Sequence, residues 1–382
     1  MSEESVLLRV FGRDFDGWKS LEIVSSLENA ARAFHFVASE RWPGESNPIR
    51  LKPGSPCEVL AGGDLLITGY IDSVQIAASA GAHEIAVAGR SKTADLVDCS
   101  AEFETGRWRN KKIEQIANDL AKPYDVTIKA QVDTGDKIKR HAIQRGETVY
   151  SSIERLARLR ALLVTDNADG DLVLTRAGNF ATDAGGGVVF SETGTGTAST
   201  ALVVGENVIS SQVSFDMSGR FSEYRVKGIR AGDDLDFGEV LQTSAESEDS
   251  DVERTRVLIV EPEARSDKKR CKVRADWEAA TRFGRSLSLT YIVQGWRQED
   301  GRLWEVNNMV SVVDALAGIE ADLLIVEVVF SISQNGTLTT LTLSPVEGFE
   351  PIAPQKKRPR TKKAGTKKGA FDEIKEGVKV SQ

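Results

Sequence analysis

Residues 322–344 read DLLIVEVVFSISQNGTLTTLTLS and carry the clearest structural signal in the chain. In the first half, apolar residues such as Val328 and Phe330 alternate with polar or less buried neighbours, which is the period of a half-buried β-strand. Asn335-Gly336 is the strongest short-range signal for a tight hairpin turn, and alternation resumes on the returning segment. This stretch therefore predicts two antiparallel strands and favours a fold that is mainly β.

The first hundred residues show the same type of pattern. Short apolar or alternating runs are separated by Gly, Pro and Asp, and they lie at Ala33–Val37, Glu58–Leu60, Leu65–Ile76 and Glu84–Ala88. Such runs with turn residues between them are typical of consecutive β-strands. We expect a β-barrel or sandwich in this region.

One internal echo connects the two regions. Asp64-Leu-Leu-Ile67 recurs as Asp322-Leu-Leu-Ile325, and each copy opens a long strand that is followed by a turn and a second strand. Two explanations stay open. The match is either coincidental, since Leu-Leu-Ile is common in strands, or the trace of two related β domains in one chain.

Between these regions the period changes to that of a helix. Ile113, Ile116 and Leu120 lie three or four residues apart and predict one helix that ends before Pro123. A second helix is expected to start at Thr148, a good N-cap residue. A short hairpin with glycine at its turn follows, so this part of the chain reads as a small α+β unit.

These patterns divide the chain into five parts. A linker rich in Gly, Ser and Thr is expected at 179–205. The second β region contains one helix, Cys271–Arg285, and an exposed acidic loop at 232–253 with nine carboxylates and no Lys or Arg. The expected parts are a first β domain at 1–105, the α+β domain at 106–178, the linker at 179–205, a second β domain at 206–350, and a basic tail at 351–382.

Charge is distributed unevenly along the chain. The tail carries ten Lys or Arg and three Asp or Glu, a local charge of +7, whereas the rest holds 39 basic and 54 acidic residues, or −15. An acidic body argues against a phosphate-gripping surface, and therefore against nucleic-acid binding as the main role. The tail has too few apolar residues to fold and is expected to be a disordered tether. Eight of its ten basic residues lie between positions 356 and 368, namely Lys356, Lys357, Arg358, Arg360, Lys362, Lys363, Lys367 and Lys368.

Residues that could support catalysis or bind a metal do not form any known pattern. The three cysteines lie far apart without a CxxC pair, the three histidines are scattered, and the chain contains no HExxH, GxSxG or P-loop motif. We therefore expect no catalytic residues, no metal site and no cofactor. The chain also lacks a secretory signal and an apolar stretch long enough to span a bilayer, so no membrane anchor is expected.

Two tryptophans stand close together in Gly295-Trp-Arg-Gln-Glu-Asp-Gly-Arg-Leu-Trp304. The segment predicts a tight hairpin that presents Trp296 and Trp304. Most tryptophans pack in cores or at interfaces, so core packing is the first interpretation and a subunit interface is the second.

Five segments give the chain a resemblance to a known family, the phage Mu tail protein P family of baseplate hub proteins. They occur in the order of the family and span most of residues 6–350. The segments are Leu66-Ile-Thr-Gly-Tyr-Ile71, Ala88-Gly-Arg-Ser-Lys-Thr-Ala-Asp-Leu-Val-Asp-Cys-Ser100, Gln144-Arg-Gly-Glu-Thr-Val149 with Ile153-Glu-Arg-Leu-Ala157, Gln294-Gly-Trp-Arg297 and Asp300-Gly-Arg-Leu-Trp304.

The resemblance implies a mainly β fold with an α+β insertion, in which the two β domains are barrels similar to tail-tube subunits. It implies a structural hub of a contractile phage tail, similar to the T-even phage hub. Such a hub is a homotrimer whose six barrels join a sixfold tail tube to a threefold central spike and line the channel. Expected partners are the tail tube protein, the central spike protein and baseplate wedge proteins, with transient passage of DNA.

The resemblance further implies a location in the virion baseplate after assembly in the host cytoplasm, and the family pattern contains no catalytic residues. Two alternatives stay open. The chain could be the hub of a tailocin or a type VI-like contractile device, which the neighbouring genes would distinguish. It could also be a peptidoglycan hydrolase of the tail tip, which a turbidity assay would distinguish.

Overall fold

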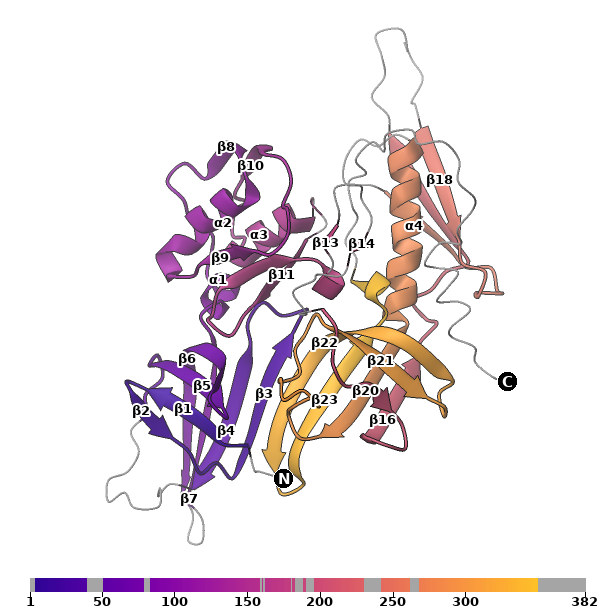
Figure 1. The fold of residues 1–382 in the computed structure, drawn as a ribbon. Helices are drawn as coiled ribbons and strands as arrows, with labels where there is room; N and C mark the ends of the chain where they lie inside the picture. Colours follow the sequence, from indigo (N-terminus) through magenta and orange to yellow (C-terminus); the bar gives the residue numbers. More distant parts are fainter. Residues whose placement is uncertain are drawn as a thin grey trace.

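The computed structural model describes residues 4–39, 51–78, 83–158, 160, 162–179, 181–182, 188–189, 196–229, 242–261 and 268–349. Two regions of β-sheet form its lower part in Figure 1, and two smaller units that contain the helices lie above them. The mainly β fold with an α+β insertion is therefore confirmed. The basic tail and residues 233–241 of the expected acidic loop lie outside the described residues.

The first barrel unit, Val6–Ser91, is built from antiparallel strands that pair in the order β3-β4-β7-β6-β5-β1-β2. The alternating sequence pattern sets the two faces of each strand, since Ile85 and Val87 are buried whereas Glu84 and Ala86 are partly exposed. The strands are β1 (Val6–Val10), β2 (Arg13–Phe15), β3 (Ser20–Ser26), β4 (Ala33–Ser39), β5 (Pro56–Ala61), β6 (Asp64–Ala78) and β7 (His83–Ser91).

The α+β unit has its own core, in which Ile116 and Leu120 pack against Ile153 and Leu156. It begins earlier than the expected residue 106, because Leu96 of its first helix is fully buried in this core. Its elements are α1 (Ala94–Asp98), β8 (Arg107–Lys111), α2 (Ile113–Ala121), a 3-10 turn (Lys122–Tyr124), β9 (Ile128–Ala130), β10 (Ile138–Ala142), α3 (Val149–Arg158), β11 (Leu163–Asp166) and β12 (Leu172–Thr175).

The second barrel unit lies beside the first and is interrupted in sequence by a further insertion. The expected hairpin at Asn335-Gly336 is confirmed, with Gly336 at a φ of +95° that favours glycine. Part of the expected linker belongs to this unit, because β15 pairs with β21. The strands are β15 (Leu202–Val203), β16 (Val208–Phe215), β20 (Leu287–Gln294), β21 (Met309–Asp314), β22 (Ile319–Ser333) and β23 (Gly336–Ser344). Two short strands, β13 (Ala181–Thr182) and β14 (Val188–Val189), precede it, and short 3-10 turns lie at Ala177–Asn179 and Val346–Gly348.

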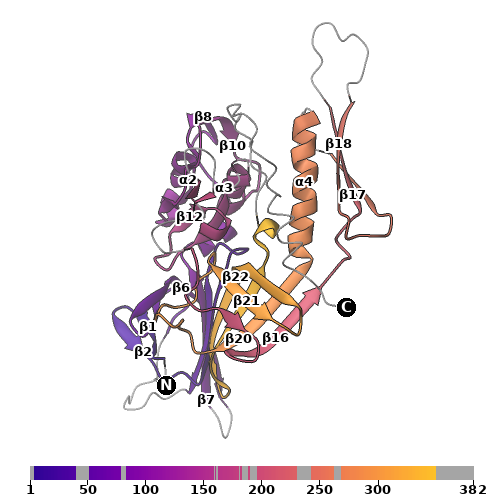
Figure 2. The ribbon, with the colours of Figure 1, turned by 45° about the vertical axis from the view of Figure 1, so that its right-hand side comes forward.

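The α4 unit is inserted between β16 and β20. It consists of β17 (Glu223–Ile229), β18 (Gln242–Glu248), β19 (Val257–Val260) and the long helix α4 (Lys268–Arg285), which packs on the sheet formed by β18, β17 and β19. Figure 2 shows α4 and its strands rising beside the α+β unit, on the same side of the barrel units. The expectation of one continuous second β domain is therefore corrected, because a separate α/β unit divides it.

The expected acidic loop is wrong for residues 242–248, which form a strand, although Glu246 and Glu248 are exposed. Residues Gln242–Glu248 form β18, which pairs with β17 along its whole length. Ala245 is buried, and Asp249 forms a buried ion pair with Arg220 at 2.8 Å. The apolar pattern here is weak because backbone pairing and one arginine, rather than a row of apolar side chains, hold the segment in place.

The two barrel units share one scheme of strand pairing. Apart from β2, each unit has six strands, which are counted here in chain order. In each unit the first strand pairs with the fourth, the second with the third, and the third with the sixth. The fifth strand pairs with both the fourth and the sixth. The fifth strands, β6 and β22, are both 15 residues long, and both carry a bulge after which they pair only with the sixth strand of their own unit. One difference is that β15 pairs parallel to β21, whereas β1 pairs antiparallel to β5.

The echo motifs lie in equivalent strands, but not at equivalent positions. Asp64 opens β6, and Asp322 lies inside β22. The bulges at Ile71/Ser73 and Ile325/Glu327 lie 254 positions apart, whereas the motifs lie 258 apart. The strand architecture is therefore repeated in the chain. The two copies of the tetrapeptide, however, do not align when the bulges of the two strands are aligned.

Candidate assembly surface

The two barrel units meet at a strand junction that makes their sheets continuous. β3 of the first unit pairs antiparallel with β22 of the second, so one sheet of 13 strands runs through both units. Figure 1 shows β3 and β22 side by side at the centre of the molecule. Both sides of this junction bury apolar residues in one common core.

The centre of the junction is the pair Phe330↔Ile23. Phe330 is 2% exposed and Ile23 is fully buried. Trp296 packs on Phe330 with ring centroids 5.0 Å apart, and its Nε1 donates to the carbonyl oxygens of Ser331 and Leu338 at 3.3 and 3.1 Å. The junction is thus a packed interface between two barrel units inside one chain.

Both tryptophans of the expected hairpin are buried in the core of the protein. Trp296 is 1% and Trp304 3% exposed, and both belong to the common core. An isolated bridge between Arg297 and Leu303 closes the hairpin. Core packing, the first of the two interpretations, is what the structure shows, and almost no ring surface is left for a contact with a second subunit.

Arg297, between these tryptophans, ties the hairpin to the first barrel unit. Its guanidinium lies 2.7 Å from Glu4 and 2.7 Å from Asp64, and it also donates to the carbonyl oxygen of Ala61 at 3.2 Å. Arg297 belongs to one of the segments that carry the family resemblance, but no pattern in the sequence indicates these three partners, which lie more than 230 positions away.

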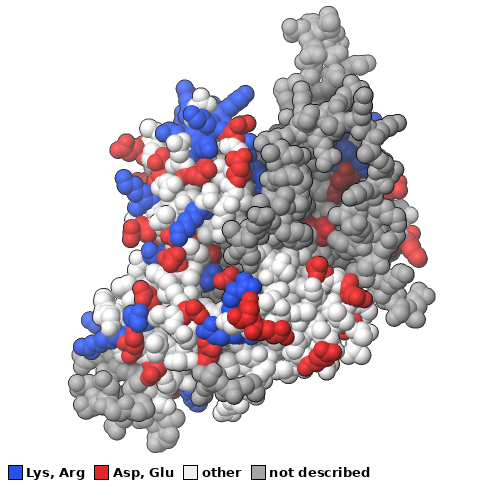
Figure 3. All heavy atoms as spheres, viewed as in Figure 1, with Lys and Arg blue, Asp and Glu red and all other residues white. Residues whose placement is uncertain are grey.

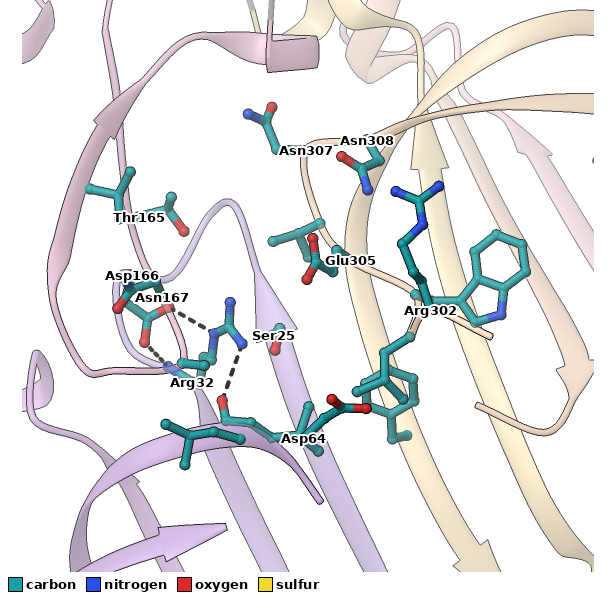
Figure 4. A pocket seen from close by; sticks show the side chains of 18 of the residues that line it. Ser25, Arg32, Asp64, Thr165, Asp166, Asn167, Arg302, Glu305, Asn307 and Asn308 are labelled. Carbon is teal, nitrogen blue, oxygen red and sulfur yellow. Dashed lines mark hydrogen bonds and ion pairs between the residues drawn. The ribbon is translucent and has the colours of Figure 1, made fainter. Parts of the chain in front are cut away.

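A cavity of about 740 Å³ lies between the first barrel unit, the α+β unit and the segment 297–308. Figure 4 shows Arg32 held between Asp166 and the carbonyl oxygen of Leu66. Asp166 also accepts hydrogen bonds from Ser91 Oγ at 2.6 Å and from the backbone N–H of Arg32 at 2.9 Å.

Three of the acids that line this cavity have structural partners. Asp166 is bonded to Arg32, Asp64 to Arg297, and Asp300 to Arg302 at 2.6 Å. These contacts hold neighbouring parts of the chain together. We therefore interpret the cavity as part of the junction between the units. No pattern in the sequence predicted the Arg32–Asp166 contact.

Several strands have an edge without a partner strand among the described residues, and two of these edges belong to β6 and β16. β6 pairs with β7 over Gly69–Ala78, but its pairing with β5 ends at Tyr70, so residues 73–78 have an open edge. β16 pairs with β20 on one side, and on its other side only Val208 takes part in an isolated bridge. Ile76 is 65% and Phe215 52% exposed on these edges.

The face of the sheet away from the common core is polar but poor in cations. One cross-strand row in the first unit contains Glu22, His35, Ala88 and Ser73, and the equivalent row in the second contains Gln212, Thr290, Thr342 and Glu327. In Figure 3, charged side chains gather over the α+β unit and along its boundary with the barrel units, with a larger uncharged area over the second barrel unit.

Among the described residues, no group of three or more His, Cys, Asp or Glu could hold a metal ion, and no helix is long and apolar enough to cross a membrane.

Three family models match successive parts of the chain. They describe a Mu phage baseplate assembly protein GpP-like N-terminal domain at residues 5–91, the second domain of a baseplate hub protein gp44-like at 93–176, and the fourth domain of the Mu phage baseplate assembly protein GpP at 267–352. The first two meet where the structure separates the first barrel unit from the α+β unit.

Known proteins match over nearly the full chain. The baseplate hub protein gp44 of Escherichia phage Mu is 34% identical over 380 residues, which cover 97% of this chain and 95% of that protein. The 43 kDa tail protein of prophage MuSo2 from Shewanella oneidensis has a similar structure, with a TM-score of 0.78, 29% identity and coverage of 91% and 99%. A tail protein from Neisseria meningitidis MC58 shares the fold, with a TM-score of 0.74, 22% identity and coverage of 92% and 100%.

Proposed function

We propose that this chain, which belongs to the family of Mu phage baseplate hub proteins, acts as a homotrimeric adaptor between the tail tube and the central spike. The chain is a structural, non-enzymatic component of the virion tail, the baseplate hub of a Mu-like phage. The adaptor role, the trimer and the channel go beyond this membership and are the content of the proposal.

The observation that carries the proposal is the repeated barrel unit. One chain holds two barrel units with the same strand pairing, joined edge to edge through β3 and β22. Three chains would supply six such units while keeping threefold symmetry. A ring of this kind presents six similar surfaces to a sixfold tube and three identical chains to a threefold spike.

The polar face of the sheet supports a role in lining the channel. The two rows described above contain Ser, Thr, Gln, His and the carboxylates Glu22 and Glu327 without Lys or Arg, and Arg90 in the next row is paired with Asp72 and Asp98. A DNA backbone binds proteins mainly through cations that neutralise its phosphates. A face of this composition would let DNA pass without retaining it.

The expected neighbours of the ring are the tail tube protein, the central spike protein and baseplate wedge proteins, with assembly in the host cytoplasm. The basic tail, Lys356 to Lys368, could dock on an acidic neighbour in the baseplate or contact DNA transiently. We propose it as a tether, since its composition favours a segment that does not fold alone.

Native mass spectrometry of the hub, purified with its tube and spike proteins, tests the proposal. We expect a species of three chains of 41.6 kDa each, and sixfold density continuous with the tube by cryo-electron microscopy. Hub chains that stay monomeric in assembled tails would refute it. We also expect no clearing of a peptidoglycan suspension, because the chain is not an enzyme.

A further inference from the structure

The two open strand edges form the basis of an inference that rests on the proposed ring and adds the contact that would close it. We propose that β16 of one copy pairs antiparallel with residues 73–78 of β6 in the next copy, in the register that β3 and β22 adopt inside one chain. The partner is thus a second copy of this chain, bound through unlike edges.

The repeat identifies which strands are equivalent. β6 and β22 are the fifth strands of their units, and the stretch of β22 after its bulge lies between β23 and β3. The same stretch of β6 pairs with β7 only. β3 and β16 are the second strands, and β3 lies between β4 and β22, whereas β16 pairs in a ladder with β20 alone. Each open edge therefore corresponds to an edge that is filled at the internal junction.

The repeat also fixes the register. Aligning the bulges places Ile76 at the position of Phe330, and aligning the cross-strand pairs through β4 and β20 places Val213 at the position of Ile23. The buried pair Phe330↔Ile23 then predicts the contact Ile76↔Val213 between copies. The next pair on the same face becomes Val74↔Phe215.

The exposed side chains on these edges fit this contact. Ile76 lies opposite Ile85 of β7, which is 3% exposed, so Ile76 faces the core side of the sheet while 65% of its own surface is exposed. Phe330 in the equivalent position is 2% exposed. Pairing with β16 would cover Ile76 and Phe215 as β3 covers Phe330.

The composition of the edges gives an independent reason. Open edge strands usually carry charges or prolines that prevent pairing with other chains. β16 reads VISSQVSF and residues 73–78 read SVQIAA, and neither stretch has a charged residue or a proline. Two unprotected edges, eight and six residues long, are expected in strands that are paired in the working assembly.

Within the sheet of the described residues, the two open edges of one chain do not meet each other. β16 ends the 13-stranded sheet, and β20, β23, β22, β3, β4 and β7 stand between it and β6. Because the two edges differ, each copy offers one to each neighbour. Such head-to-tail contacts close a ring instead of stopping at a dimer.

Disulfide crosslinking tests the register. The double variant Ile76→Cys/Val213→Cys, in hub assembled with its tube and spike proteins, should give covalent trimers on a non-reducing gel after mild oxidation, since directly paired residues lie within disulfide distance. The matched control Ile76→Cys/Gln212→Cys shifts one cysteine to the opposite face and should give at least tenfold less trimer. Each single variant controls for the native Cys57, Cys99 and Cys271.

The outcomes separate this inference from the proposed function. A native trimer in which the matched pair gives no more crosslink than the shifted pair would overturn the edge pairing and leave the adaptor role intact. Dimers from Val213→Cys alone would show that like edges pair, which also overturns it. Failure to find a trimer in assembled tails would remove the proposed function and this inference together.

A charged residue on the open edge gives a second test. Ile76→Lys should leave the monomer folded, because the side chain is exposed, and should abolish the trimer. Phe11→Lys is the control. Phe11 is also exposed, at 76%, but lies in the β1–β2 turn, so this variant should keep the trimer. A normal trimer with Ile76→Lys would contradict the proposed contact.

Discussion

The two barrel units have the same strand connectivity, but only the first has its second strand covered on both edges. β3 lies between β4 and β22, whereas its counterpart β16 has a strand partner on one side only. Equivalent residues therefore have opposite environments, as Phe330 at 2% and Ile76 at 65% exposure illustrate. The comparison shows that the position in the repeat fixes which way a side chain faces, and that the neighbouring strand decides whether it is buried.

The units also differ in what they carry between their second and third strands. A short turn, residues 27–32, joins β3 to β4, whereas the whole α4 unit separates β16 from β20. β16 and β20 still pair over Val208–Phe215. A barrel of this type therefore tolerates a folded insertion at this turn, because both ends of the insertion leave the sheet at adjacent strands.

The largest expected effect is the difference between alanine substitutions at the two equivalent positions, Phe330 and Ile76. Phe330→Ala should lower the free energy of unfolding by about 4 kcal/mol, because a buried ring that packs on Trp296 is replaced by a cavity. Ile76→Ala should cost less than about 1 kcal/mol in the monomer. Urea unfolding of the monomeric chain measures both, and equal losses would contradict the comparison.

The α4 unit should be destabilised by removing the buried ion pair between Arg220 and Asp249. Asp249→Ala should cost about 3 kcal/mol, since it leaves the guanidinium of Arg220 buried beside one remaining partner, Asp251. Asp251→Ala removes a partner that is 41% exposed and should cost less than about 1 kcal/mol. Hydrogen exchange should show the loss in β17–β19 and α4, and a loss spread through β20–β23 would show that the units are coupled.

The stability of the α+β unit should depend on pH through His141. Burial, assisted by the charge of Arg155, lowers the pKa of His141 to about 4, and Glu147 opposes the shift weakly. In the unfolded chain the histidine has a pKa of about 6.5 and binds the proton more readily. Its contribution is therefore complete above pH 6.5 and is lost as the pH falls towards 4, by up to about 3 kcal/mol. Urea midpoints at pH 7 and pH 5 should differ less in His141→Gln, and an unchanged difference would rule out His141.

The smallest effect is expected where the two junction positions differ in charge. Glu327 stands after the bulge of β22, where the first unit has Ser73. Burial, followed by the charges of Glu28 and Glu22, raises the pKa of Glu327. The charged form is thus disfavoured in the folded state, so stability should rise slightly as the pH falls through this raised pKa. Glu327→Gln should stabilise the chain at pH 7 by less than about 1 kcal/mol, and a destabilised variant would show that the carboxylate has a needed partner.

Local patterns predicted most elements of the fold. The alternation in β6, β7, β22 and β23 and the helical spacing at Ile113–Leu120 are direct consequences of one buried face, so a single sequence contains them. β18 was missed because QTSAESE buries chiefly Ala245 and its stability comes from pairing with β17. The start of the α+β unit was placed too late because Leu96 packs against residues far along the chain.

The assembly surface was less accessible to sequence reasoning. The pairing of β3 with β22 joins segments about 300 positions apart, and nothing in either strand specifies that register. The tryptophan hairpin was expected, but no pattern in it specifies the contact that buries Trp296 against Phe330 of β22. The tetrapeptide echo pointed to the correct pair of strands although its letters lie four positions out of register.

The internal junction has a consequence for how a ring could form. Six separate barrels would need five encounters between molecules before the last contact closes the ring, whereas three chains with β3 already on β22 need two. A tethered contact behaves as if its partner were present at a local concentration on the order of millimolar, so it forms before contacts between molecules. Joining two barrels in one chain therefore lowers the number of concentration-dependent steps from five to two. It also forces the two kinds of barrel to alternate, so that a miscounted ring of five cannot close.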